Sequence, residues 1–133
     1  MREILFRGKR TDNGEWEYGD LWCNPYGKRV VCIVSPINDQ GTTGGNEVDP
    51  ETVGQFTGLT DKNGRKIFER DIVKGKVHEL NGYRVRKGVI EYHDTGFIMN
   101  LKPNSDSGYD QKNVPFEREV IGNVFDNPEL LEV

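Results

Sequence analysis

The chain has 133 residues, of which 34% are apolar and 30% are charged, and its formal net charge is -4. This length suits one domain or two small lobes that share an interface, and it excludes two large cores. The net negative charge argues against a broad electrostatic surface for nucleic acid, because phosphate contacts supply most non-specific affinity.

The many turn-forming residues of the sequence favour an all-β fold. Sixteen glycines stand among repeated Asn, Asp and Pro residues, a composition typical of many turns. No window carries an apolar stripe at helical spacing over three turns. The first predicted hairpin has a strand over 3–7 that Gly8 ends, a turn over 11–14, and a second strand that places Trp16 and Tyr18 on one face.

The next predicted pair joins a strand over 21–23 to one over 29–34 through a turn at 24–27. The apolar run within the second strand predicts burial on both faces and a central place in its sheet. Cys23 and Cys32 are expected to remain thiols, because a cytosolic setting keeps cysteines reduced.

Residues 35–47 are polar and Gly-rich, with a single large apolar side chain. Such a segment cannot offset its ordering entropy by burial, so we expect a long mobile loop. A lid that closes over a ligand is the less favoured alternative. Asp49 as N-cap and Pro50 at the first helical position then predict a short helical turn.

The central segment, residues 52–73, is predicted to organise the fold. Asn63-Gly64 near its middle can supply the two positive φ angles of a type I′ hairpin turn. Apolar residues on both sides of that turn would then meet: Val53, Phe56, Leu59, Ile67, Phe68, Ile72 and Val73.

Three blocks of the sequence carry a family resemblance: FRGKR followed by EWEYGDL, VGQFTGLTDKNGRKIFERDIV, and EVIGNVFDNPELLE. In this order they resemble the YopX family of small proteins encoded by bacteriophages and prophages of Gram-positive bacteria. The resemblance implies one all-β, small barrel-like domain over 1–133 whose biochemical role is not established. Arg70 departs from the family pattern, which more often has Gly at this position. We therefore expect the backbone at Arg70 to be less sharply bent than is usual in the family.

The C-terminal half is predicted to continue with strands over 88–92 and 97–101 around a hairpin at 93–96. Phe97, Met99 and Leu101 would share one face. The order of these strands resembles the start of an SH3-like barrel, and a boundary after residue 48 would give subdomains 1–48 and 49–133.

The end of the chain is predicted to hold a loop, a strand and a helical turn. Residues 102–113 are polar and loop-like, and Gly122 interrupts the last strand, 119–125, as expected at a bulge. A final helical turn would then pack Leu130 and Leu131 onto the body.

No constellation predicts catalysis, a metal or a cofactor. Cys23 and Cys32 lie nine residues apart and the two histidines, His78 and His93, fifteen apart, whereas structural zinc sites use close pairs. Glu69 with Asp71 and Glu91 with His93 share strand faces, as solvated pairs routinely do. We therefore expect no enzyme, and a small enzyme that uses Glu91 and His93 is the third alternative.

Binding is the expected activity. Four aromatic residues within eleven positions predict an interface: Trp16, Tyr18, Trp22 and Tyr26. Self-association into a homo-oligomer is the first expectation, followed by an unknown phage or host protein. Nucleic acid is the runner-up, because aromatic residues beside basic ones can stack bases: Tyr83, Arg84, Arg86 and Lys87.

The sequence also predicts where the protein works. No apolar run approaches 18 residues, so no membrane span is expected. The N-terminus lacks the long apolar core of a signal peptide. We expect the protein to stay in the cytosol of the host cell.

Overall fold

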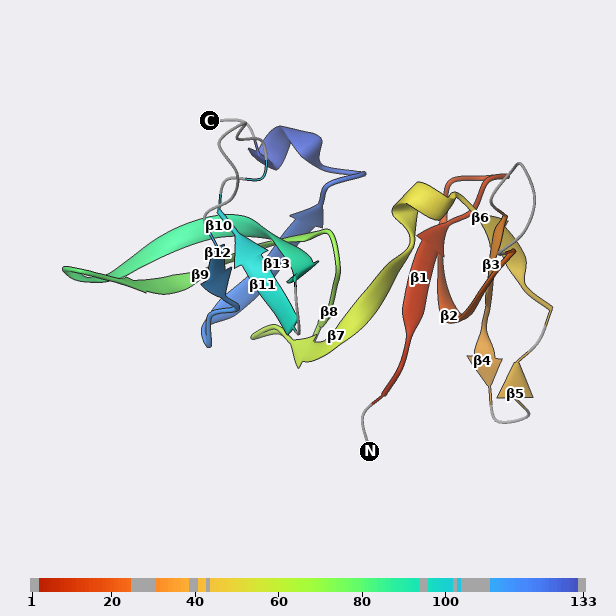
Figure 1. The fold of residues 1–133 in the computed structure, drawn as a ribbon, viewed down its shortest axis with the longest axis horizontal. Coiled ribbons are helices and arrows are strands. Elements are labelled where there is room, and N and C mark those ends of the chain that lie inside the picture. The colour runs from red at the N-terminus through yellow and green to blue at the C-terminus, as the bar shows by residue number, and fades with distance from the viewer. Residues whose placement is uncertain are drawn as a thin grey trace. The chain divides into compact units, whose positions relative to one another are not determined.

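The structure is a computed structural model, and it describes residues 3–24, 31–38, 41–42, 44–93, 96–101, 103 and 111–131. Almost all regular structure in this part is β, as predicted (Figure 1). The strands are β1 (Phe6–Lys9), β2 (Trp16–Cys23), β3 (Cys32–Ser35), β4 (Ile37–Asn38), β5 (Gly41–Thr42), β6 (Asn46–Val48), β7 (Gly54–Thr60), β8 (Lys66–Phe68), β9 (Asp71–Glu79), β10 (Gly82–His93), β11 (Gly96–Asn100), β12 (Gln111–Asn113) and β13 (Arg118–Asn123). Two 3-10 helices are η1 (Pro50–Thr52) and η2 (Pro128–Leu131).

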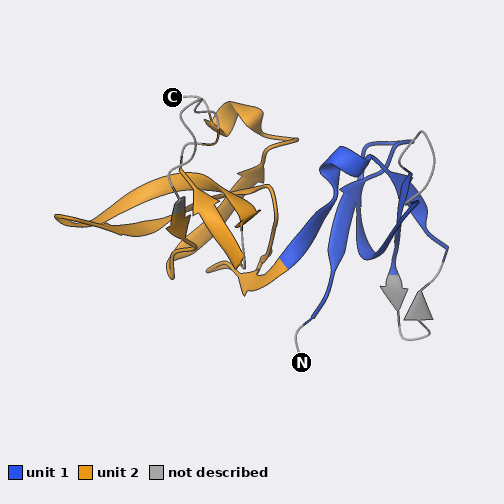
Figure 2. Cartoon of the chain, viewed as in Figure 1, with its two compact units in different colours: residues 1–56 blue, residues 57–133 orange. Residues whose placement is uncertain are grey.

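The chain forms two compact units, residues 1–56 and 57–133, so that β7 begins in one unit and ends in the other (Figure 2). The described strands form open sheets and no closed barrel. Closure of the second unit would require β12 to pair with β13, yet these strands lie at opposite ends of the order β12-β11-β10-β9-β13. The barrel-like closure implied by the resemblance is therefore not found among the described strands.

The first unit is built on antiparallel strands in the order β6-β3-β2-β1, with β7 next to β1. The predicted β1–β2 hairpin is confirmed, and Lys9 lies opposite Trp16. Gly8 does not end the first strand but lies inside it. A Cβ atom at Gly8 would approach Cγ2 of Val48 to 2.7 Å, so this glycine permits close packing of the strand rather than a turn.

Cys23 and Cys32 form a disulfide, which corrects the expectation of two thiols. They are directly opposite in β2 and β3, and their Cα atoms are 4.1 Å apart. A separation of nine residues hides this contact in the sequence, because only the strand register brings the two positions together. Cys32 is buried with Val34 and Val48 in the small core of the first unit.

The segment 35–47 is not one long loop. It contains the β4–β5 pair, and most of β6, whose Asn46 and Glu47 pair with Val34 and Ile33 of β3. Backbone pairing with β3 orders a segment that has few apolar side chains. The proposed lid falls partly on residues 39, 40 and 43, which lie outside the described residues.

The helical turn after residue 48 is confirmed. Asp49 has an extended backbone, and its Oδ1 accepts a hydrogen bond of 3.1 Å from the Glu51 N–H at the start of η1. Pro50 occupies the first helical position, where a missing N–H costs nothing.

The hairpin turn of the central segment has a different form from the predicted type I′ turn. Only Gly64 has a positive φ, at 81°, and Asn63 does not. The Gly64 N–H donates to the Asp61 carbonyl, and the Asp61 Oδ1 accepts from the N–H groups of Asn63 and Arg65, each at 2.9 Å. The carboxylate thus stabilises a wider turn that needs one left-handed residue.

The apolar residues of the central segment do not all meet in one core. Val53 packs with the core of the first unit. Leu59, Ile67 and Val73 belong to the core of the second unit. The unit boundary between Phe56 and Thr57 separates them.

Arg70 has a positive φ of 72°, and among the described residues no other non-glycine residue has a positive φ. The backbone is therefore sharply bent there, contrary to the expectation from the missing glycine. Its N–H donates to the Ile90 carbonyl at 2.8 Å, and its carbonyl accepts from the Val124 N–H at 3.0 Å. Hydrogen bonds to Ile90 in β10 and to Val124 just after β13 hold the bend, so an arginine occupies a conformation that usually favours glycine.

The core of the second unit lies on one face of the β9–β11 region. Ile67, Val73, Val77, Ile90 and Met99 are buried there, with Phe97 and Leu101 packed against them as predicted. The expected loop over 102–113 ends in a strand, β12, that pairs with β11; residues 102 and 104–110 lie outside the described part. The bulge at Gly122 is confirmed by a register shift between Val120 and Gly122.

Candidate binding surface

Residues 74–87 form a two-stranded ribbon from β9, β10 and the short turn between them. In Figure 1 the green ends of these strands project beyond the other strands of the second unit. The register pairs Lys74 with Lys87, Lys76 with Val85, and His78 with Tyr83. Because opposite residues in an antiparallel pair point to the same side, these six residues share one face of the ribbon.

We call this face the outer face, and all six of its side chains are exposed: Lys74, Lys76, His78, Tyr83, Val85 and Lys87. It contains three lysines and no carboxylate. The neighbouring strand β13 brings Glu119 opposite Lys74, and Glu117 lies 3.6 Å from the Lys76 Nζ. The carboxylates therefore lie along one edge of the outer face and not within it.

The opposite face of the ribbon is partly packed. Val77 is 5% exposed and joins the core of the second unit. Toward the tip, the Arg86 Nη1 donates to the Glu79 Oε1 at 2.8 Å, with both side chains about a quarter exposed. The ribbon's one acidic residue is thus paired on the face that does not carry the lysines.

A segment from β12 to β13 crosses β9 at Gly75. A Cβ atom at Gly75 would lie 2.4 Å from the Pro115 Cγ, so glycine is needed for this crossing. The Lys76 N–H donates to the Glu117 carbonyl at 3.1 Å, and the Arg118 Nη1 donates to the Pro115 carbonyl at 3.0 Å. These bonds fix the segment beside the ribbon.

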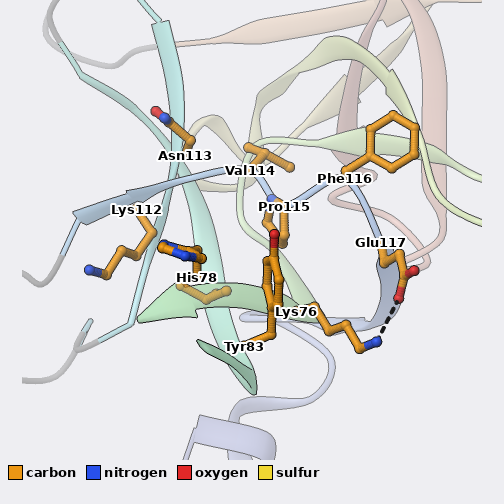
Figure 3. Close-up of a pocket in the computed structure, with 10 residues that line it drawn as sticks. Lys76, His78, Tyr83, Lys112, Asn113, Val114, Pro115, Phe116 and Glu117 are labelled. Atoms are coloured by element: carbon orange, nitrogen blue, oxygen red, sulfur yellow. Dashed lines mark ion pairs between the residues drawn. The ribbon is translucent and has the colours of Figure 1, made fainter. Parts of the chain in front are cut away.

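The crossing segment and the ribbon enclose a hollow of about 630 Å³ (Figure 3). His78 and Tyr83 line it from the ribbon, Lys112 from β12, and Phe116 from the crossing segment. In Figure 3 the Phe116 ring points away from the rings of His78 and Tyr83. The rings of His78 and Tyr83 are 5.2 Å apart and nearly perpendicular. Two further hollows, of about 590 and 520 Å³, adjoin the tip and the Lys74 side of the ribbon. Aromatic and basic side chains therefore meet around concave surface.

The four residues predicted for nucleic acid do not form one cluster. Tyr83 and Lys87 lie on the outer face, whereas Arg84 and Arg86 lie on the other. Lys74 and Lys76 take their place on the outer face, and the sequence interpretation missed both. The Asn81-Gly82 dipeptide was the available signal, because a hairpin turn there pairs residues near 75 with residues near 86.

The predicted aromatic interface lies on the first unit. Trp16, Tyr18 and Trp22 alternate along β2 and so share one face; Tyr26 lies outside the described residues. Tyr18 is 44% and Trp22 is 57% exposed, while Trp16 is half-buried. The Arg7 guanidinium carbon is 4.4 Å from the Trp16 ring centroid, a cation-π contact that covers this ring.

The two candidate acid/base pairs have structural contacts. Asp71 is buried, and its Oδ2 accepts from the Phe68 N–H at 2.8 Å. Glu91 Oε1 lies 2.8 Å from the His93 Nε2, and the Asn100 amide donates to the same carboxylate at 3.2 Å. Neither pair lines one of the three hollows described above.

The described residues hold neither a metal-ion cluster nor a membrane-spanning helix. No group of three His, Cys, Asp or Glu side chains among them could hold a metal ion. No helix among them is long and apolar enough to cross a membrane.

Comparison with known proteins gives a family and a fold. The family model described as "YopX protein" matches residues 5–132. The crystal structure of protein EF1440 from Enterococcus faecalis is similar at a TM-score of 0.54 and 24% identity, and the match covers 99% of this chain and 100% of that chain. This likeness shows a shared fold. No curated protein matches the sequence.

Proposed function

This chain belongs to the YopX family, and we propose that it is a non-enzymatic binding module that binds nucleic acid through the outer face of its β9–β10 ribbon. The non-enzymatic part rests on the contacts of Asp71 and Glu91. The Asp71 carboxylate accepts from the Phe68 N–H, and the Glu91 carboxylate is hydrogen-bonded to His93 and Asn100. Neither carboxylate lines one of the three hollows.

The observation that carries the proposal is the segregation of charge. Residues 74–87 contain five basic residues and one acidic residue, a formal charge of +4 in a chain of net charge -4. The one acid, Glu79, is paired with Arg86 on the other face. The overall charge that argued against nucleic acid therefore does not describe this surface, since a local cationic face is what attracts phosphates.

A like-charge pair on the outer face supports a binding role. Lys74 and Lys87 are directly opposite in β9 and β10, and like charges at such positions destabilise a sheet. Glu119 offsets this on the β13 side of Lys74, but Glu119 also pairs with Lys62 at 3.1 Å. A polyanion that contacts both lysines would relieve their repulsion in the complex.

The test is binding of a labelled oligonucleotide, measured by fluorescence anisotropy over a series of salt concentrations. Each phosphate neutralised contributes about -0.7 to -0.9 to the slope of log K against log salt. Three outer-face lysines predict a slope of roughly -2 to -3. Lys74→Glu and Lys87→Glu should each weaken binding and make this slope shallower.

Lys66→Glu is the matched control, because it changes the net charge equally from an exposed position on β8, outside residues 74–87. It should bind nearly as well as the unmodified chain. Binding that is absent at low salt, or that all three substitutions reduce equally, would refute the proposal.

Self-association is the second candidate function. Its specific support is the pair of exposed rings, Tyr18 and Trp22, on one face of β2. Light scattering should then report an oligomer that Trp22→Lys converts to a monomer. A monomer at every concentration would end this candidate without affecting the first.

We also propose, from the family resemblance, a phage or prophage origin and a place in the host cytosol. The Cys23–Cys32 disulfide makes the location testable. Structural disulfides persist in oxidising compartments and are rare in the cytosol. If the proposed location is right, thiol alkylation of the chain taken from acid-quenched cells and unfolded before labelling should modify both cysteines, since Cys32 is buried in the folded chain.

A further inference from the structure

On the basis of the proposed function, we infer that the ligand is single-stranded and that its unpaired bases stack on Tyr83 and Phe116. Tyr83 is 71% exposed and Phe116 is 95% exposed. Leu80 and Val85, also on the ribbon, are exposed as well. Exposed apolar side chains that gather in one place indicate a binding site, whereas single ones do not.

The two rings lie at different parts of one hollow and do not face each other (Figure 3). Both line the 630 Å³ hollow, together with Lys76, His78 and Lys112. An aromatic face beside a cation can hold a base and its phosphate together, which is how sequence-tolerant single-strand sites are built. The nearly perpendicular contact with His78 restricts the Tyr83 ring before any ligand arrives, so less rotational freedom is lost on binding.

The alternative ligand is duplex DNA, because a two-stranded ribbon fits the major groove. Base edges in that groove are read mainly by bidentate hydrogen bonds, from Arg or Lys to guanine and from Asn or Gln to adenine. Of these residue types the outer face has only Lys, and it has no Arg, Asn or Gln. Bases inside a duplex also stack on one another, so exposed rings could not reach their faces. The residues on the ribbon therefore favour a single strand.

The experiment compares a labelled 12-nucleotide oligo(dT) with a 20-base-pair duplex, both by fluorescence anisotropy at the same low salt concentration. The variants are Tyr83→Ala, Phe116→Ala and Tyr83→Phe. Tyr92→Ala is the control, because Tyr92 is 53% exposed on the same strand and packs against Phe97, away from the hollows. A single strand carrying 2-aminopurine reports stacking directly.

The single strand should bind more tightly than the duplex. Tyr83→Ala and Phe116→Ala should each weaken it by roughly 5- to 100-fold, the range expected for the loss of one stacked base. Tyr83→Phe should bind like the unmodified chain, because the ring is kept. Tyr92→Ala should have no effect. The 2-aminopurine fluorescence should change on binding, and this change should be smaller with either alanine variant.

Two results would overturn the inference in different ways. Equal or tighter duplex binding that ignores both alanine variants, but is lost in Lys87→Glu, would reject stacking and leave the proposed function in place. No salt-dependent binding of either nucleic acid would reject both.

Discussion

Asp61 links the hairpin turn of the central segment to a strand that lies far along the chain. Its Oδ1 accepts from the N–H groups of Asn63 and Arg65, and its Oδ2 accepts from the Val120 N–H at 3.0 Å. Burial raises the pKa of Asp61, but the hydrogen bonds from Val120, Arg65 and Asn63 and the Arg65 charge outweigh it and bring the pKa below 3.8. The folded state thus favours the ionised carboxylate.

Asp61→Asn should lower the free energy of unfolding at pH 7 by about 2 kcal/mol, because the charged acceptor of three N–H groups is lost. A carboxylate with a depressed pKa stabilises the fold above its unfolded-state pKa of about 4, and this contribution disappears as the pH falls through the lower folded-state pKa. Urea unfolding at pH 7 and at pH 3 measures both values. The difference between variant and unmodified chain should shrink at pH 3; a constant difference would contradict this assignment.

Arg70 offers a test of backbone conformation. At φ 72° an L side chain costs about 1 to 2 kcal/mol, and glycine avoids this cost. Arg70→Gly should therefore keep the stability or raise it by up to about 1 kcal/mol, since greater freedom of the unfolded chain offsets part of the gain. Arg70→Val should lower it, because a β-branched residue is poorly tolerated there. Thermal unfolding of both variants separates these outcomes, and a stabilising valine would be incompatible with the bend.

At the scale of elements, β7 depends on burial of Phe56. This side chain is 5% exposed, and its N–H donates to the Leu5 carbonyl at 2.8 Å. Phe56→Ala should reduce the free energy of unfolding by about 3 to 5 kcal/mol. Phe116→Ala, at a ring that is 95% exposed, is the matched control and should cost little. A loss below about 1 kcal/mol at Phe56 would show that the strand does not need this ring.

The β2–β3 pair depends on its cross-link. The disulfide closes a short loop, with its cysteines nine positions apart, and a loop of this size restricts the unfolded chain by about 2 to 3 kcal/mol. Replacing both Cys23 and Cys32 with Ala should lower stability by that amount in non-reducing urea unfolding. A reductant should lower the stability of the unmodified chain and leave the double variant unchanged. Equal stability of all forms would contradict this role.

Elements that depend on neighbouring residues were predictable from the sequence. The β1–β2 hairpin, the Asp49 cap and the bulge at Gly122 are examples, because turn and cap residues act within a few positions. Elements fixed by distant partners were missed. Gly8 looked like a strand end because Val48 was not known to pack on it, and β12 looked like loop because its pairing with β11 supplies order that its polar residues do not.

At the scale of the whole molecule, the placement of charge matters more than its sum. Lys87→Glu and Lys66→Glu both change the net charge from -4 to -6. Only Lys87→Glu replaces the repulsion with Lys74 by an attraction, worth about 0.2 to 1 kcal/mol. We expect Lys87→Glu to raise stability slightly in low-salt thermal unfolding while it weakens oligonucleotide binding. If both variants lost stability equally, the repulsion between Lys74 and Lys87 would make no contribution to the free energy of unfolding.

The candidate surface was only half predictable. Tyr83 and Lys87 followed from their basic and aromatic neighbours, but Lys74 and Lys76 needed the β9–β10 register, and Phe116 needed the crossing at Gly75. Strand pairing and close backbone approach join residues that the sequence keeps apart. A surface composed of several strands is therefore harder to read than a local motif.

The pairing of β9 with β10 also limits how this ribbon can change in length. Side chains alternate between its two faces. Removing one residue from one strand would therefore turn the outer-face residues beyond the deletion toward the core, and it would expose residues that are now buried, such as Val77. Adding two residues to each strand would keep every side chain on its present face. Insertions and deletions in the ribbon should therefore be tolerated in even steps, and the reach of the ribbon can vary while its lysine face is kept.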